Sequence, residues 1–221
     1  MLRRGGRALA DSRTLAVPGK SPGDDYPLET VQIDHSPVDL QIVDDTYRLS
    51  IGRAWISVAT DLYSRMITGY YLSLEAPSAL SVGLCIAQSE LPKEEWLKYL
   101  KIDGTWPVWG VPRTIHLDNG TEFRSETVMR SCEQYCIHID YRPAGRPHFG
   151  GMVESMIKTL QQELHTLPGS TFSSPAKRGK YDSERHAALT LSELERWIVK
   201  YIVGTYHKGS SRESVGGKVG Q

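Results

Sequence analysis

The first patterned stretch, LETVQIDHSPVDLQIVDD, alternates apolar and polar residues and therefore predicts a β-strand with one polar face. Val31 and Ile33 fall on one face, and Gln32 and Asp34 fall on the other. Two β-rich runs, AWISVAT and MITGYYLSL, follow after it and are joined by a short connection. We therefore expect an antiparallel meander of three strands.

Beyond Pro77 the pattern changes to helices that alternate with short strands. The segment SALSVGLCIAQSEL predicts a helix whose inner stripe contains Leu80, Leu84 and Ala87. The strands TIHLD and IHIDY are expected on either side of a helix that Ser125 caps and that ends at Cys136. The inner face of this second helix is expected to contain Val128, Met129, Cys132 and Tyr135.

Two helices are predicted in the second half of the chain. The first, MVESMIKTLQQELHTL, has a core-facing stripe of Val153, Ile157, Leu160 and Leu164. On the flank beside this stripe lie Glu154, Lys158, Gln161 and His165. After a long loop, the capping box from Thr190 to Glu193 opens the last helix, with Leu191, Leu194, Ile198 and Tyr201 facing inward.

The predicted order of elements, β-β-β-α-β-α-β-α, is typical of an α/β or α+β sandwich with a mixed sheet. Right-handed crossovers between its parallel strands limit the possible topologies. We expect three regions: a flexible basic arm or linker over residues 1–27, a folded core over 28–207, and a disordered tail over 208–221.

Composition and charge narrow the function classes. A chain of 221 residues with 39% apolar residues is long enough for one sizeable domain. Its 26 basic and 26 acidic residues cancel, so any nucleic-acid binding must be local. Three cysteines suit a reducing compartment and are expected to be buried thiols rather than zinc ligands. No run approaches the roughly 20 apolar residues of a membrane span or forms a secretory signal, so we expect a cytoplasmic protein.

Three acidic residues stand out by their predicted positions. Asp34 lies within the first strand, Asp118 follows the fourth strand in HLDNGTEF, and Glu154 lies in the first turn of a helix. Each also has an ordinary explanation: Asp118-Asn-Gly is a typical turn, and Glu154 can pair with Lys158 one helical turn later. Adjacent strands are about 4.8 Å apart, so Asp34 and Asp118 can share a cation if their strands are neighbours. Crowded carboxylates then predict a Mg²⁺ site that accepts phosphate oxygens.

Other acidic and aromatic residues have structural explanations that we favour. Asp61 is expected to hold a hairpin turn with Ser64 and Arg65, and Asp44 and Asp45 to lie in a solvated turn. Asp140 could lie on the active face, but a structural role is favoured. Tyr141 and Trp106 could stack on bases, although packing in the core or in a loop is the preferred interpretation.

The motifs QIDH, HLDNGTEF and GRPHFGGMVES, with 35 residues between Asp118 and Glu154, resemble the D, D-35-E signature of the retroviral integrase and DDE transposase superfamily. The stretches ATDLYSRMITGYYLS, PSALSV, YRPAGRPHFGGMVES and LHTLPGSTFS are similar to the catalytic core of large bacterial transposases. The nearest resemblance is to the DDE subunits of mercury-resistance-type transposons, and a more remote one is to phage Mu transposase. It covers about residues 27–207.

The resemblance implies an RNase H-like fold with a mixed five-stranded sheet flanked by helices. It also implies DNA 3′-end cleavage and strand transfer that depend on Mg²⁺ or Mn²⁺, with two ions in the DNA-bound state. Expected partners are transposon-end and target DNA, an AAA+ ATPase that selects the target, and further copies of the chain. Relatives also carry helix-turn-helix domains before the core and a small β-barrel after it. Neither pattern occurs here, so we expect an excised core or a truncated product.

The resemblance assigns the metal-ligand and catalytic roles to Asp34, Asp118 and Glu154. Lys158 matches a position that meets DNA near the active site. Contacts with phosphate are also considered for Asn119, Arg146 and His148, of which Arg146 is favoured because a guanidinium binds phosphate oxygens bidentately. Two alternatives stay open: an RNase H-like nuclease, and a catalytically silent interaction module of a transposition complex.

Overall fold

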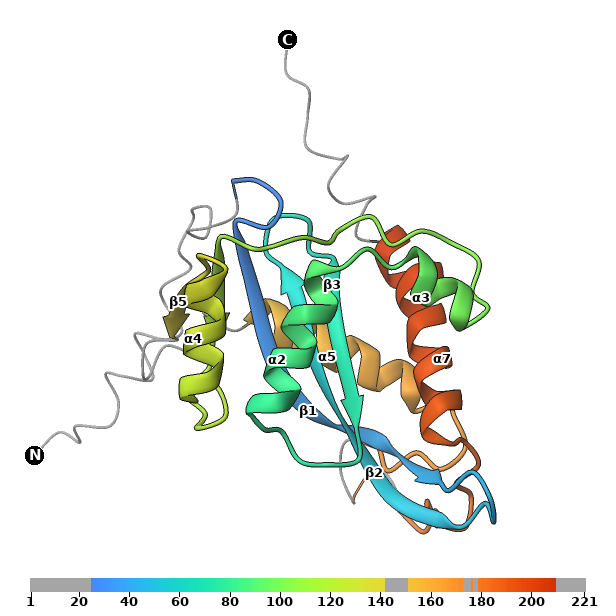
Figure 1. The fold of residues 1–221 in the computed structure, drawn as a ribbon. Helices are drawn as coiled ribbons and strands as arrows, with labels where there is room; N and C mark the ends of the chain where they lie inside the picture. Colours follow the sequence, from blue (N-terminus) through green and yellow to red (C-terminus); the bar gives the residue numbers. More distant parts are fainter. Residues whose placement is uncertain (1–24, 142–150, 173–175, 177–178, 210–221) are drawn as a thin grey trace, which may run out of the picture.

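A mixed five-stranded sheet with the strand order β3-β2-β1-β4-β5 forms the centre of the protein in a computed structural model (Figure 1). The structure describes residues 25–141, 151–172, 176 and 179–209. The first three strands are antiparallel, and β4 and β5 run parallel to β1. This arrangement confirms the predicted mixed sheet with an antiparallel meander, which is the sheet of the RNase H-like fold. The strands are β1 (Thr30–Val43), β2 (Ser50–Asp61), β3 (Ile67–Ser73), β4 (Thr114–Leu117) and β5 (His138–Tyr141).

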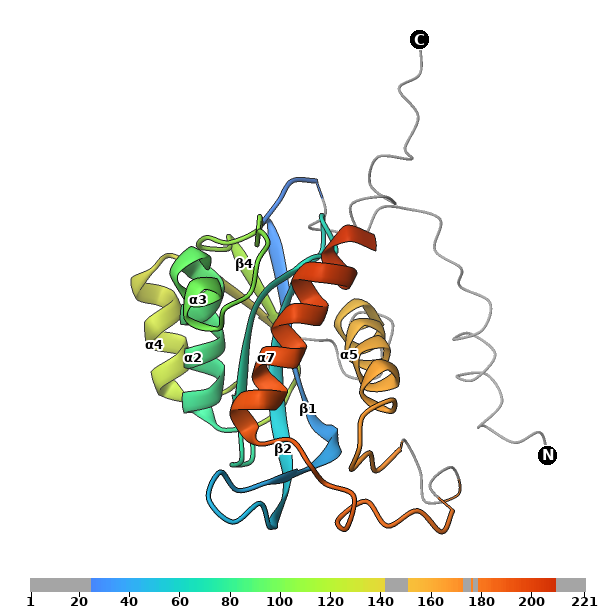
Figure 2. The same ribbon diagram turned by 90° about the vertical axis from the view of Figure 1, so that its right-hand side faces the viewer.

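Helices cover both faces of the sheet (Figure 2). One face packs against α2 (Ala79–Glu90) and α4 (Glu126–Gln134), and the other packs against α5 (Gly151–Leu164) and α7 (Leu191–Tyr201). A short helix, α3 (Glu94–Tyr99), adds Leu97 to the larger core on the α5 side, and α7 continues into the π-helix η2 (Ile202–Tyr206). Apolar residues on the two faces of β1 therefore pack into two different hydrophobic clusters. Val31 and Ile33 contribute to the α2 side, whereas Val38 and Leu40 contribute to the α5 side.

The predicted caps and the core stripe of α5 are confirmed. Ser125 accepts the backbone N–H of Val128, and Thr190 and Glu193 form the capping box of α7. Val153, Ile157, Leu160 and Leu164 are all buried. The expected structural role of Asp61 is also confirmed, because its buried carboxylate accepts hydrogen bonds from the N–H and the hydroxyl of Ser64. Trp106 packs in the core, as preferred, and donates its indole N–H to the Ile67 carbonyl.

The predicted inner stripe of α2 was wrong. Leu80 and Leu84 are exposed, and the helix instead buries Ser81, Val82, Cys85 and Ser89. The reason lies in β3, where a Cβ on Gly69 would come within 2.6 Å of the Ser89 backbone. Helix and strand approach so closely here that only small side chains fit between them, and the leucines are excluded.

The predicted inner face of α4 was wrong in part. Val128 and Cys132 are buried, but Met129 and Tyr135 are exposed. The thiol of Cys136 is likewise exposed rather than buried, because this residue lies just past the helix in a left-handed conformation with φ of 56°. A helix this short, covered on one side only, buries a narrower stripe than the apolar pattern suggests.

Several predictions concern residues outside the described ones. They include the basic arm up to residue 24, the tail from residue 210, Arg146 and His148. In the part of the chain that is described, no helix is long and apolar enough to cross a membrane.

Candidate active site

The pairing of β1 with β4 brings the backbones at Asp34 and Asp118 into register. The parallel ladder joins Thr30 to Thr114 and Gln32 to His116. Asp34 and Asp118 each follow two residues after that last pair. The two aspartates therefore lie at matching positions where two neighbouring strands leave the ladder. Asp34 is half-buried, and Asp118 is exposed.

Both aspartates are oriented by the same local hydrogen bond. Oδ1 of Asp34 accepts the backbone N–H of His35 at 2.8 Å, and Oδ1 of Asp118 accepts that of Asn119 at 2.7 Å. A hydrogen bond of this kind restricts a carboxylate relative to its own backbone. The same local contact thus occurs in both aspartate motifs.

Asp34 and Glu154 line one pocket of about 410 Å³ between β1 and α5. His35, Ser36 and Asp39 form its strand side, and Lys158 and Gln162 lie with Glu154 on its helix side. Asp118 does not line this pocket. Within the described ranges, no group of three His, Cys, Asp or Glu side chains is close enough to hold a metal ion. The structure thus brings two of the three predicted ligands to one pocket and the third to the neighbouring strand end.

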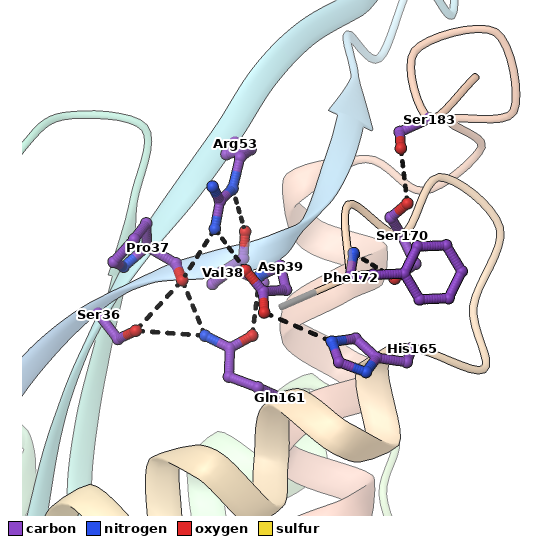
Figure 3. Close-up of polar contacts among 10 residues, drawn as sticks. All are labelled: Ser36, Pro37, Val38, Asp39, Arg53, Gln161, His165, Ser170, Phe172 and Ser183. Atoms are coloured by element: carbon purple, nitrogen blue, oxygen red, sulfur yellow. Dashed lines mark hydrogen bonds and ion pairs between the residues drawn. The ribbon is translucent and has the colours of Figure 1, made fainter. Parts of the chain in front are cut away.

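The carboxylate of Asp39, which also lines the pocket, contacts two basic side chains of the protein (Figure 3). Arg53 Nη2 lies 2.6 Å from Asp39 Oδ1, and His165 Nε2 lies 3.4 Å from Oδ2. Two basic partners satisfy this carboxylate within the protein. Asp39 therefore has a structural role, which separates it from Asp34 on the same strand.

His35 connects the two aspartate motifs. Its ring stacks on Phe123, with centroids 4.6 Å apart and planes 7° apart, and its Nδ1 lies 2.7 Å from the Ser57 hydroxyl. Burial lowers the pKa of His35, and the nearby carboxylates of Glu122 and Asp34 oppose this effect. Phe123 is fully buried and belongs to the loop after Asp118, so the stack holds that loop against the strand that carries Asp34.

A second connection runs through Gln32, which is also buried. Its Nε2 lies 3.1 Å from Nδ1 of His116 on β4, and its Oε1 accepts the Val153 N–H on α5 at 3.4 Å. Sequence analysis identified neither Gln32 nor Phe123 as part of the site. The available signal was the placement of Gln32 on the same strand face as Asp34, because a polar residue on a core-facing position requires a partner.

The predicted DNA-contact residues do not all lie at the pocket. Lys158 is exposed and lines the pocket one turn after Glu154. Asn119 is exposed, and its side-chain oxygen accepts a hydrogen bond from Arg124 Nη2 at 2.5 Å, which stabilises the turn after Asp118. Arg146 and His148 fall outside the described residues.

The chemistry of this site fits a hard divalent cation. Carboxylate oxygens are the protein ligands that Mg²⁺ and Mn²⁺ prefer, and Asp34 and Glu154 present them at one pocket. Lys158 in the same pocket supplies positive charge that suits a phosphate group. The arrangement can therefore bind a cation together with an anionic ligand.

The chain is similar to two proteins of transposition systems. It is 26% identical over 189 residues to the transposase for transposon Tn552 of Staphylococcus aureus, covering 77% of this chain and 37% of that protein. It is 29% identical over 205 residues to the transposon Tn7 transposition protein TnsB of Escherichia coli, covering 89% of this chain and 28% of TnsB. The chain thus spans about a third of the length of these relatives.

Solved structures with a similar arrangement are more remote. The HTLV-2 integrase catalytic core domain in complex with magnesium is 16% identical with a TM-score of 0.40, covering 65% of this chain and 74% of that one. The BIV integrase catalytic core domain is 18% identical with a TM-score of 0.40, covering 76% and 82%. The family model of the TnsB C-terminal domain matches residues 32–169, more than half of the chain. The chain therefore belongs to the TnsB C-terminal domain family.

Proposed function

We propose that this chain is the catalytic core of a DDE transposase, a polynucleotidyl transferase that cleaves DNA 3′ ends and transfers them to target DNA. The observation that carries the proposal is the register of Asp34 with Asp118 on neighbouring parallel strands, combined with Glu154 in the pocket of Asp34. Membership in the TnsB C-terminal domain family and the transposition proteins among the relatives support it.

In this proposal Asp34, Asp118 and Glu154 hold divalent cations, Mg²⁺ or Mn²⁺, with two ions in the DNA-bound state. Such ions activate water and stabilise the charge that develops on the phosphoryl group and its leaving oxygen. The hydrogen bonds from the following backbone N–H groups restrict the carboxylates of Asp34 and Asp118 before substrate arrives. Lys158 binds a phosphate of the DNA beside Glu154, and Asn119, Arg146 and His148 are further candidate phosphate contacts.

The wider assignments are also proposals. We propose that residues 28–207 form the catalytic unit and that it is related to the transposases of mercury-resistance-type transposons. DNA ends, target DNA, an AAA+ ATPase and further copies of the chain are the proposed partners, in the cytoplasm. The positive charge of Lys158 in the pocket is consistent with a DNA phosphate as ligand.

A catalytically silent binding module is the second candidate. It is favoured by the finding that no three potential ligands gather closely enough to hold a metal within the described residues. DNA phosphates complete metal sites of this kind, because Mg²⁺ takes few protein carboxylates and fills its remaining positions with phosphate and water. The two candidates therefore differ in whether metal and DNA together produce a reaction.

The test is nicking and joining of labelled transposon-end DNA by the protein, with Mg²⁺ or Mn²⁺. We expect joined products from the wild type and none from Asp34→Asn or Glu154→Gln. Asp45→Asn, an exposed turn acid outside the pocket, is the control and should keep full activity. Equal activity in all variants would sink the assignment. DNA binding without any nicking or joining by the wild type would favour the silent module.

A further inference from the structure

One edge of β1 has a gap in its strand pairing beside the pocket. β4 pairs with this edge up to Gln32, and pairing resumes further along, where Leu40 forms a bridge with Ser170. In that second stretch the Gln41 N–H bonds to the Gly169 carbonyl at 2.9 Å. Among the described residues, no strand pairs with this edge between Ile33 and Val38. Asp34 lies in this gap.

The side chain of Gln161 on α5 fills the far part of the gap (Figure 3). Its Oε1 accepts the Asp39 N–H at 2.8 Å, and its Nε2 donates to the Pro37 carbonyl at 2.8 Å. In a parallel ladder, a strand residue bonds to the carbonyl before and the N–H after the residue that it faces. The amide of Gln161 makes the same pair of bonds around Val38. It is only 8% exposed, so water cannot readily replace these bonds.

The position of Gln161 on α5 relates it directly to Glu154. Seven residues separate the two, which is about two helical turns and leaves them about 20° apart around the helix axis. Both therefore face β1 from the same side of the helix. A rotation of α5 that turned Glu154 away from Asp34 would have to break the hydrogen bonds of Gln161 to the Asp39 N–H and the Pro37 carbonyl, together with the one from its Nε2 to the Ser36 hydroxyl at 3.3 Å.

Gln32 makes a similar contact at the other end of the helix. Its Oε1 accepts the N–H of Val153, the residue before Glu154, and its Nε2 contacts His116, two residues before Asp118. The two glutamines thus hold α5 against β1 on both sides of Glu154, and Gln32 also ties in β4.

We propose that Gln161 and Gln32 are positioning residues that fix Glu154 relative to Asp34 and so set the metal affinity of the site. The metal-ligand role of Asp34 and Glu154 rests on the proposed function. The attachment of α5 to β1 rests on the hydrogen bonds of the two glutamines. Partners that orient metal ligands commonly change metal affinity 10- to 100-fold when they are lost, although they do not touch the ion.

The experiment compares Gln161→Leu, Gln161→Glu and Gln88→Leu with the wild type. The Leu variant loses all three hydrogen bonds of the Gln161 side chain. The Glu variant keeps the acceptor for the Asp39 N–H but loses the donor to the Pro37 carbonyl and the Ser36 hydroxyl. Gln88→Leu is the matched control, because Gln88 Oε1 accepts the Tyr70 N–H at 2.9 Å from α2 on the opposite sheet face. Amide hydrogen exchange is measured by NMR across α5 and α7, and MnCl₂ is titrated against the melting temperature.

In Gln161→Leu, we expect exchange in the first two turns of α5 to rise at least tenfold relative to α7. The MnCl₂ concentration for half-maximal stabilisation should rise about tenfold, with a smaller rise in Gln161→Glu. Gln88→Leu should change neither the ratio of exchange rates between α5 and α7 nor the MnCl₂ concentration for half-maximal stabilisation. An unchanged ratio in Gln161→Leu, or a wild-type MnCl₂ midpoint, overturns the proposal. If MnCl₂ does not stabilise even the wild type, the claim that the glutamines set the metal affinity of the DNA-free site fails, and the exchange ratio alone decides whether Gln161 positions α5. The proposed function is decided separately, by the nicking and joining assay.

Discussion

Asp61 and Asp118 both follow or end a strand and begin a turn, yet they differ in almost every other respect. Asp61 is fully buried and accepts hydrogen bonds from the Leu28 N–H, the Ser64 N–H and the Ser64 hydroxyl. Asp118 is exposed, and its carboxylate accepts the N–H of the next residue. A carboxylate saturated by internal donors stabilises the fold, whereas one held by a single local bond keeps oxygens for a ligand.

Replacing Asp118 should break activity and leave the fold intact. For Asp118→Asn we expect at least a thousandfold loss of strand transfer, which corresponds to about 4 kcal/mol of transition-state stabilisation. The free energy of unfolding should change by less than about 0.5 kcal/mol, because the residue is exposed and the turn can persist. Single-turnover strand-transfer assays and urea denaturation of the protein measure the two effects. A large loss of stability would contradict the comparison.

Replacing Asp61 should do the opposite. Asp61→Ala leaves the Leu28 and Ser64 donors buried without their acceptor, which should cost about 3–5 kcal/mol of unfolding free energy. Urea denaturation measures this change. Activity per folded molecule should stay near that of the wild type, since Asp61 does not line the pocket. A variant with wild-type stability would show that water or a shifted turn replaces the carboxylate.

His207 extends the comparison to a buried group that must remain neutral. Burial lowers its pKa to about 4, and its Nε2 accepts the Ile67 N–H, a hydrogen bond that requires this nitrogen to be unprotonated. The folded-state pKa lies below the ordinary value of 6.5, so the unfolded chain binds a proton first as the pH falls. Stability from this group is complete above pH 6.5 and decreases toward pH 4. Between pH 7 and 5 the loss should be about 2 kcal/mol. Denaturation at several pH values should show a flatter dependence for His207→Gln.

Asp44 gives the smallest expected effect, although it accepts three backbone N–H groups, as many hydrogen bonds as Asp61 accepts. Its donors are Thr46, Tyr47 and Leu49 in an exposed hairpin turn. The hydrogen bonds, that from Tyr47 foremost, lower the pKa of Asp44 below 3.8, so its contribution is present above that pH and lost as the pH falls below it. Asp44→Ala should lower the melting temperature less than Asp61→Ala, because water can solvate the exposed donors. Equal shifts would mean that burial does not separate the two aspartates.

Much of the fold could be predicted from local pattern. The three-strand meander, the caps at Ser125 and Thr190 and the inner stripe of α5 depend on residues that are close in sequence. The buried face of α2 could not be predicted in this way. Its choice of small residues over Leu80 and Leu84 follows from the contact with Gly69, which belongs to a different element. Hydrophobic periodicity describes a helix alone and contains no information about the shape of its neighbour.

The candidate site shows the same division between features set by local sequence pattern and features set by contacts between distant elements. The sequence by itself determined where the candidate carboxylates lie, because their positions at strand ends and on a helix flank follow from residue type and period. Their proposed role came from the resemblance of the motifs. Only the tertiary structure decided that Asp34 shares a pocket with Glu154, that its strand is in register with that of Asp118, and that Asp39 is neutralised by Arg53. It also decided that Gln32 and Gln161 hold the elements together. These contacts join residues more than 80 positions apart in the chain in most cases, and the pairing of such distant segments depends on global packing rather than on local preference.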